Sequence, residues 1–122
     1  MTDALVIDDN RQTADALKQM LNVIGVSART AYGASAAMSA LKLSTPGLVL
    51  LDINMPGLDG TEILAFLRRE PRLTHVPVIV ITSDDQPETR QRVMKGGANA
   101  IVIKPATLDL LESALKKVGV LK

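Results

Sequence analysis

Cysteine and tryptophan are missing from this 122-residue chain, and aromatic residues make up only 2% of it. Without cysteine, the protein has no disulfide bond and no thiolate metal site. Disulfides are typical of oxidising compartments, so their exclusion is compatible with a reducing cytosol. With no tryptophan, one tyrosine and one phenylalanine, the chain has almost no surface on which nucleic-acid bases could stack.

Three further absences narrow the class of protein. No apolar run approaches the ~20 residues that span a bilayer. Residues 1–4 carry no basic leader ahead of an apolar segment, so we expect no secretory signal. The net charge is only +1, whereas nucleic-acid binding is typical of strongly basic domains. We therefore expect a cytoplasmic protein that binds neither membranes nor nucleic acid.

Apolar residues account for 47% of the chain, and its length fits one domain with a substantial core, residues 1–122. Most of the short apolar runs are continuous in Val, Ile and Leu, which predicts strands covered on both faces. The second run is more polar and predicts an edge strand. The five predicted strands are 4–8, 27–31, 48–52, 78–82 and 100–103.

Apolar residues at helical spacing fill the segments between these strands. Asn10 predicts the start of a first helix, which Gly25 ends, and Asp59 with Glu62 has the spacing of a capping box. Further helices are predicted over 35–43 and 87–95. Thr107 caps a last helix whose predicted buried stripe is Leu108, Leu111, Leu115 and Val118, with Gly119 at its end. This alternation predicts an α/β domain with a parallel sheet, right-handed crossovers and helices on both faces.

Polar side chains stand where the predicted strands end. Asp8 and Asp9 end the first apolar run, Asp52 the third, Thr82 the fourth and Lys104 the fifth. A charge at the end of a buried strand is costly unless it has a partner or a task. In parallel α/β sheets the ligand crevice lies at the carboxyl ends of the strands, where the strand order reverses. We therefore expect one shared site.

The residue types at this site suggest phosphoryl chemistry. Carboxylates in one crevice raise one another's pKa unless a cation lies between them, and Mg²⁺ prefers such oxygen ligands. With Lys104 as a second positive charge, the site could hold a phosphoryl group against Asp52 as nucleophile and beside the Thr82 hydroxyl. Each feature alone has a structural alternative, because Asp8 with Asp9, and residues 82–85, could simply cap the helices that follow.

Four motifs, in this order, resemble those of the response regulator receiver domain, over about residues 5–118. They are Val-Ile-Asp-Asp-Asn at 6–10, Leu-Leu-Asp-Ile-Asn-Met-Pro-Gly-Leu-Asp-Gly at 50–60, Pro-Val-Ile-Val-Ile-Thr-Ser at 77–83, and Gly-Ala-Asn-Ala-Ile-Val-Ile-Lys-Pro at 97–105. The resemblance implies a CheY-like, doubly wound (βα)5 sandwich of three layers. Its five-stranded parallel sheet would have the flavodoxin-like order 2-1-3-4-5.

The resemblance also implies roles for the matching residues. Asp52 would accept a phosphoryl group from a histidine kinase or phosphotransfer protein, and Thr82 and Lys104 would contact that group. Mg²⁺ (or Mn²⁺) would be held by Asp9, Asp52 and the backbone carbonyl of Asn54, with Asp8 helping through water.

Further positions of the motifs would shape or tune the site. Met55, Pro56, Ser83 and Pro105 would form the loops beside the phosphoryl group. Asn54 and Asp84, each two places after a principal residue, would tune autodephosphorylation. Such a domain catalyses only its own phosphoryl transfer and dephosphorylation. It would signal by contact with a downstream effector protein, or by phosphorylation-dependent self-association.

One position departs from the family pattern. Receivers usually carry Tyr or Phe three residues before the lysine of the fifth strand, and this aromatic turns inward when the Thr moves to the phosphoryl group. This chain has Ile101 there, which has neither ring nor hydroxyl. We therefore expect the switch formed by Thr82 and position 101 to be muted or differently routed.

Two other functions start from the same residues. A phospho-aspartate hydrolase of the haloacid dehalogenase type needs a second Asp two residues after the nucleophile, and that place holds Asn54, which cannot transfer a proton. A receiver-shaped scaffold that is never phosphorylated has no need of the three aspartates, Thr82 and Lys104 together.

Overall fold

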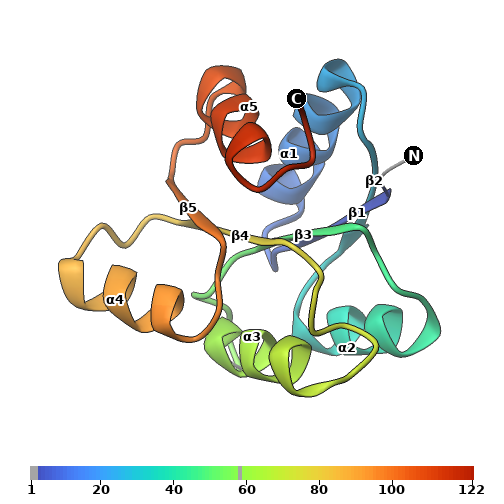
Figure 1. The fold of residues 1–122 in the computed structure, drawn as a ribbon, viewed down its shortest axis with the longest axis vertical. Helices are drawn as coiled ribbons and strands as arrows, with labels where there is room; N and C mark the ends of the chain where they lie inside the picture. The colour runs from blue at the N-terminus through green and yellow to red at the C-terminus, as the bar shows by residue number, and fades with distance from the viewer. Residues whose placement is uncertain (1–2, 58) are drawn as a thin grey trace.

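The computed structural model describes residues 3–57 and 59–122; residues 1 and 2, and Leu58 of the motif at 50–60, lie outside this description. Within it, strands and helices alternate along the chain in the predicted order (Figure 1). The strands are β1 (Asp3–Ile7), β2 (Ser27–Ala31), β3 (Leu48–Leu51), β4 (Val78–Thr82) and β5 (Ala100–Ile103). The helices are α1 (Arg11–Ile24), α2 (Ala34–Leu43), α3 (Gly60–Arg69), α4 (Pro87–Lys95) and α5 (Leu108–Lys117).

The strands form one parallel sheet in the order β2-β1-β3-β4-β5, which confirms the flavodoxin-like order 2-1-3-4-5. β1 pairs with β2 on one side and with β3 on the other. The strand order therefore reverses at β1, and β1 and β3 end side by side: Ile7 is in register with Leu51. This reversal fixes the position of the ligand crevice in folds of this kind.

Helices cover both faces of the sheet, as Figure 1 shows, with α1 and α5 on one face and α2, α3 and α4 on the other. Alternate side chains of a strand point to opposite faces. Leu5 and Ile7 of β1 accordingly join the core cluster beneath α2, α3 and α4, whereas Ala4 and Val6 join the cluster beneath α1 and α5. The three central strands are thus buried on both faces, which explains their continuous apolar sequence.

Asn10, Asp59 and Thr107 cap the helices as predicted. Asn10 accepts a hydrogen bond from the Thr13 N–H at the start of α1, and Thr107 caps α5. Asp59, at the start of α3, accepts from the Thr61 N–H and not from the Glu62 N–H that a capping box uses. Among the helices of residues 3–57 and 59–122, none combines the length and the apolar character that crossing a bilayer requires.

Three predicted details are corrected. β1 and β3 end at Ile7 and Leu51, so Asp8 and Asp52 stand just beyond the strands in which the sequence placed them. The second helix begins one residue earlier than predicted, at Ala34. Leu108 was predicted to be buried but is 44% exposed; α5 joins the core only from Leu111 onward, so its first turn lies outside the packed layer.

Candidate functional site

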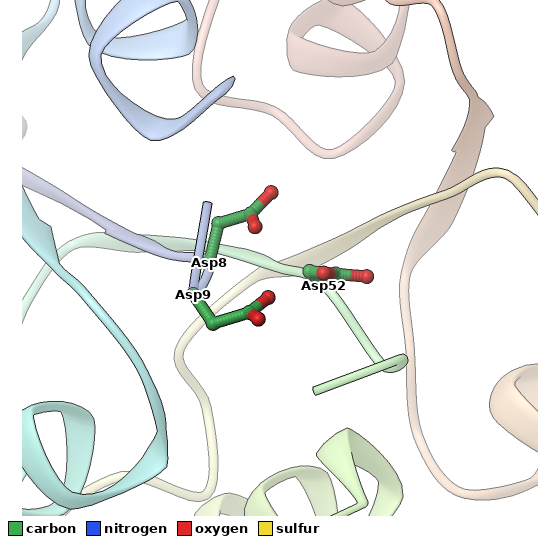
Figure 2. A group of neighbouring side chains, drawn as sticks. All are labelled: Asp8, Asp9 and Asp52. Carbon is green, nitrogen blue, oxygen red and sulfur yellow. The ribbon is translucent and has the colours of Figure 1, made fainter. Parts of the chain in front are cut away.

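Three aspartates meet at the carboxyl edge of the sheet. Asp8 and Asp9 follow β1, and Asp52 follows the neighbouring strand β3 (Figure 2). The Asp52 N–H donates to the Ile7 carbonyl at 3.0 Å, which extends the β1–β3 pairing and holds the two strand ends together. One carboxylate oxygen from each residue lies within 4.8 Å of the other two. Asp8 and Asp52 are buried, while Asp9 is exposed.

Lys104 reaches these carboxylates from the end of β5, the edge strand on the opposite side of β3 from β1 and β2. It follows β5, and its Nζ atom lies 3.1 Å from Oδ2 of Asp8 and 3.7 Å from Oδ2 of Asp52. Asp8 also accepts a hydrogen bond from the Asn10 N–H at 2.9 Å. Asp8 is therefore engaged on both of its oxygens, which leaves Asp9 and Asp52 as the carboxylates best placed to bind an added cation.

Thr82 and Asn54 lie against each other beside this group. The hydroxyl oxygen of Thr82 accepts a hydrogen bond from the Asn54 side-chain amide at 3.1 Å. The backbone N–H of Asn54 donates to Oδ1 of Asp52, also at 3.1 Å. Asn54 thus links Asp52, which follows β3, to Thr82, the last residue of β4.

The environment of Asp52 disfavours its ionised form. Burial raises the pKa of the Asp52 carboxyl group above its ordinary value, and the negative charges of Asp8 and Asp9 raise it further. The hydrogen bond from the Asn54 N–H and the charge of Lys104 act in the opposite direction without cancelling the increase. The site therefore holds more negative charge than Lys104 compensates, and an added cation would relieve it.

The remaining predicted loop residues surround the site in different ways. Met55 is buried in the core cluster beneath α3, whereas Pro56, Ser83 and Pro105 are exposed. The Lys104–Pro105 peptide bond is cis. Ile101, at the predicted switch position, is partly buried and packs against the core on the side of α2, α3 and α4.

Two residues that position the site were not singled out from the sequence. A Cβ atom on Gly60 would lie 2.4 Å from the Ile53 Cα and 2.6 Å from the Asp52 carbonyl oxygen, so only glycine lets α3 begin this close to the β3 end. Thr89 of α4 donates a hydrogen bond to Asp84 at 2.6 Å. In the sequence, Gly60 is one glycine of a motif and Thr89 one threonine of a predicted helix. Neither residue type by itself indicates a close backbone approach or a hydrogen bond to a distant loop.

A groove of about 510 Å³ opens next to Lys104. Its floor and walls come from one side of α1, including Ala16, Leu17 and Met20, and from Lys104–Ala106 across from it. The groove therefore joins a largely apolar surface to the charged site.

Comparisons with known proteins identify the family of this chain. The family model of the response regulator receiver domain matches residues 4–116. An uncharacterised 14.6 kDa protein of Leptolyngbya boryana is 36% identical over 110 residues, which is 90% of this chain and 82% of the relative. The C4-dicarboxylate transport transcriptional regulatory protein DctD of Pseudomonas aeruginosa is 34% identical over 95% of this chain, which spans only 25% of that longer protein.

Among solved structures, the chemotaxis protein CheY4 of Vibrio cholerae superposes with a TM-score of 0.90. The match covers 97% of this chain and 98% of that one, at 24% sequence identity. This likeness establishes a shared fold, in agreement with the strand order of the sheet.

Proposed function

This chain belongs to the response regulator receiver family of two-component signalling, and we propose that residues 1–122 form one receiver domain that is phosphorylated on Asp52. A histidine kinase or a phosphotransfer protein would supply the phosphoryl group. The observation that carries the proposal is the meeting of Asp52 with Asp8, Asp9 and Lys104 at the reversal point of the sheet.

The proposed reaction is a single displacement at phosphorus. A carboxylate oxygen of Asp52 attacks the phosphorus atom of a phosphohistidine; the new O–P bond forms as the N–P bond breaks, and the imidazole leaves. The backbone N–H of Asn54, 3.1 Å from Oδ1, orients the carboxylate. Lys104, 3.7 Å from Oδ2, stabilises the negative charge that the phosphoryl oxygens bring.

The residues at the site fit a hard divalent cation. The three carboxylates supply only oxygen ligands, and their atoms are close enough to share one ion. Asp9, Asp52 and the backbone carbonyl of Asn54 would hold Mg²⁺ (or Mn²⁺), with Asp8 contributing through water because Lys104 and Asn10 already engage it. When bound, the ion supplies positive charge that neutralises the phosphoryl oxygens.

The neighbouring residues complete the proposed site. The Thr82 hydroxyl would donate to a phosphoryl oxygen. Asn54 and Asp84 would tune the loss of the phosphoryl group by hydrolysis, which with the transfer itself is the only reaction the domain catalyses. Met55, Pro56, Ser83 and Pro105 would shape the surrounding loops.

We propose that the output is protein contact. The groove beside Lys104 offers a largely apolar surface next to the proposed phosphorylation site. A downstream effector protein, or a second phosphorylated copy, would recognise the altered surface. We place the protein in the cytoplasm, with no membrane or nucleic-acid contact by this domain.

Acetyl phosphate with Mg²⁺, read by intact mass, tests the proposal. We expect one phosphate adduct on the wild-type protein and none on Asp52→Asn, while Asp15→Asn serves as a control that keeps the adduct. A wild-type protein without an adduct that also binds no beryllofluoride, a phosphoryl mimic, would instead be an unphosphorylated scaffold. Sustained turnover of a generic phosphatase substrate that Asp52→Asn abolishes would indicate the hydrolase.

A further inference from the structure

The hydroxyl oxygen of Thr82 is held in place by two donors. The Asn54 side-chain amide and the backbone N–H of Asp84 each donate to it at 3.1 Å. A hydroxyl oxygen has two acceptor lone pairs, so both are used. Thr82 is also only 1% exposed, so little solvent reaches its side chain.

Asp84 is in turn held by α4. Its Oδ2 atom accepts a hydrogen bond from the Thr89 hydroxyl at 2.6 Å, and its Oδ1 atom accepts one from the Gln86 N–H at 3.0 Å. The Thr89 hydrogen bond is the main reason that the pKa of Asp84 lies below its ordinary value. Thr89 belongs to the first turn of α4 and is 8% exposed. Thr89 thus holds the loop after β4 through Asp84, and the same loop holds the Thr82 hydroxyl through the Asp84 N–H.

Ile101 cannot supply the aromatic relay of related proteins. It is partly buried against the core, and it has no ring to change places with the Thr82 hydroxyl. Any effect of phosphorylation on α4 therefore needs another physical connection. The chain of hydrogen bonds from Thr82 through Asp84 to Thr89 is such a connection.

Building on the proposed function, we propose that Thr89 is a positioning residue: through Asp84 it latches Thr82 in the unphosphorylated position, and release of this latch carries the signal into α4. When the hydroxyl turns to a phosphoryl oxygen on Asp52, it leaves the Asp84 N–H. The loop after β4 is then free to shift, and the Asp84–Thr89 hydrogen bond is lost or remade.

The movement would extend to a second contact of α4. Arg92, one turn beyond Thr89, lies 3.8 Å from the carboxylate of Asp59, which caps α3. Thr89 and Arg92 thus tie one side of α4 to the loop after β4 and to the start of α3. A shift of the first turn of α4 changes both contacts together.

A latch that stabilises only the resting position must weaken binding of a phosphoryl mimic, because the mimic has to break it. The test measures the beryllofluoride affinity in the presence of Mg²⁺. Thr89→Val keeps the buried volume and removes the hydroxyl, and Thr89→Ser keeps the hydroxyl. We expect Thr89→Val to bind about fivefold more tightly than wild type, the worth of one net hydrogen bond, and Thr89→Ser to restore the wild-type affinity.

Two further readouts separate a latch from a purely structural role. The methyl resonance of Thr82 in ligand-free Thr89→Val should move toward its position in the beryllofluoride complex of the wild type. Asp84→Ala should also tighten binding, and the double variant should bind no more tightly than either single variant, since both remove one connection.

The outcomes distinguish the latch from the function on which it rests. If wild type bound beryllofluoride but neither Thr89→Val nor Asp84→Ala bound it more tightly, the latch would be wrong and the receiver function would stand. If the two changes tightened binding in an additive way, no single connection would join them and the latch would again be wrong. A wild type that bound no beryllofluoride would overturn both proposals.

Discussion

Charged side chains that are partly or fully buried lie both where the strands end, at the carboxyl edge of the sheet, and where they begin, at the amino edge. The two edges differ in the groups that surround these charges. At the carboxyl edge, charges meet charges: Asp8, Asp9 and Asp52 converge, and Lys104 compensates only part of their charge. At the amino edge, the guanidinium of Arg68 finds, within residues 3–57 and 59–122, only neutral oxygen atoms as hydrogen-bond partners. It donates hydrogen bonds to the carbonyls of Thr74, Val76 and Gly97 and to the side chain of Asn99.

Arg68 therefore has a structural role. Its hydrogen-bond partners lie in the segments that precede β4 and β5, so this one side chain connects α3 to the starts of two strands. Burial lowers the pKa of the Arg68 guanidinium from its usual value, but the planar fork of donors is fully matched by acceptors. No added ligand is needed.

At the carboxyl edge, by contrast, like charges face one another and are only partly compensated. Its negative charges raise the pKa of Asp52, and its hydroxyl, amide and ammonium groups surround an acidic centre. A buried charge is therefore not by itself a sign of function. What distinguishes the two edges is whether fixed neutral groups satisfy the charge or whether like charges are left facing one another.

The largest effect we predict is at Gly60, where the carboxyl edge is most crowded. In Gly60→Ala the new Cβ meets two backbone atoms, the Ile53 Cα at 2.4 Å and the Asp52 carbonyl oxygen at 2.6 Å. Because backbone cannot move aside as a flexible side chain can, we expect a loss of about 4 kcal/mol in the free energy of unfolding. Urea denaturation measures it. The displaced Asp52 should also lose its beryllofluoride binding.

The control for this change is Gly119→Ala. Gly119 has open space around it but a φ of +85°, so only backbone strain of about 1 kcal/mol is expected. Equal losses for the two variants would show that the close approach of α3 to the β3 end is unimportant.

A change at the amino edge should lower the stability of the fold without changing beryllofluoride binding at the carboxyl edge. Arg68→Met removes the donors to four acceptor groups, most of them partly buried, which should lower the free energy of unfolding by about 3 kcal/mol. Arg69→Met, at the exposed neighbouring position, should cost less than about 0.5 kcal/mol. The beryllofluoride affinity of folded Arg68→Met should equal that of wild type. A matching loss of affinity would mean that the two edges of the sheet are energetically coupled.

The smallest effect is a gain in stability at the carboxyl edge. Because the folded protein raises the pKa of Asp52, folding is favoured by this group below its unfolded pKa near 3.8, and that contribution is lost as the pH rises through the folded pKa. Asp52→Asn has no such charge. Its melting temperature should exceed that of wild type by several degrees at neutral pH and in the absence of divalent cations.

Two conditions sharpen this last prediction. The advantage of Asp52→Asn should disappear below about pH 3.8, where Asp52 is protonated in both states. Mg²⁺ should stabilise wild type more than the variant, because the variant lacks one of the proposed ligands. A variant less stable than wild type at neutral pH without Mg²⁺ would show that Lys104 fully compensates the charge of Asp52.

Much of the fold was predictable because it depends on local patterns. Continuous apolar runs predicted the central strands, and Asn10, Asp59 and Thr107 predicted the helix starts that the structure confirms. Leu108 was mispredicted for a related reason: helical spacing identifies a face but not where along the helix its neighbours begin. The resemblance, not the spacing, supplied the strand order.

The sequence by itself determined which residue types stand at the strand ends, and hence that Asp8, Asp9, Asp52, Thr82 and Lys104 share an edge of the sheet. In a parallel sheet all strands run in the same direction, so the residues that follow their carboxyl ends lie at the same edge wherever they occur in the chain. Only the tertiary structure decided how they are paired. It placed Lys104 on Asp8, and it joined Thr82 to Asn54 and, through Asp84, to Thr89, because contacts of a few ångströms depend on how whole layers pack.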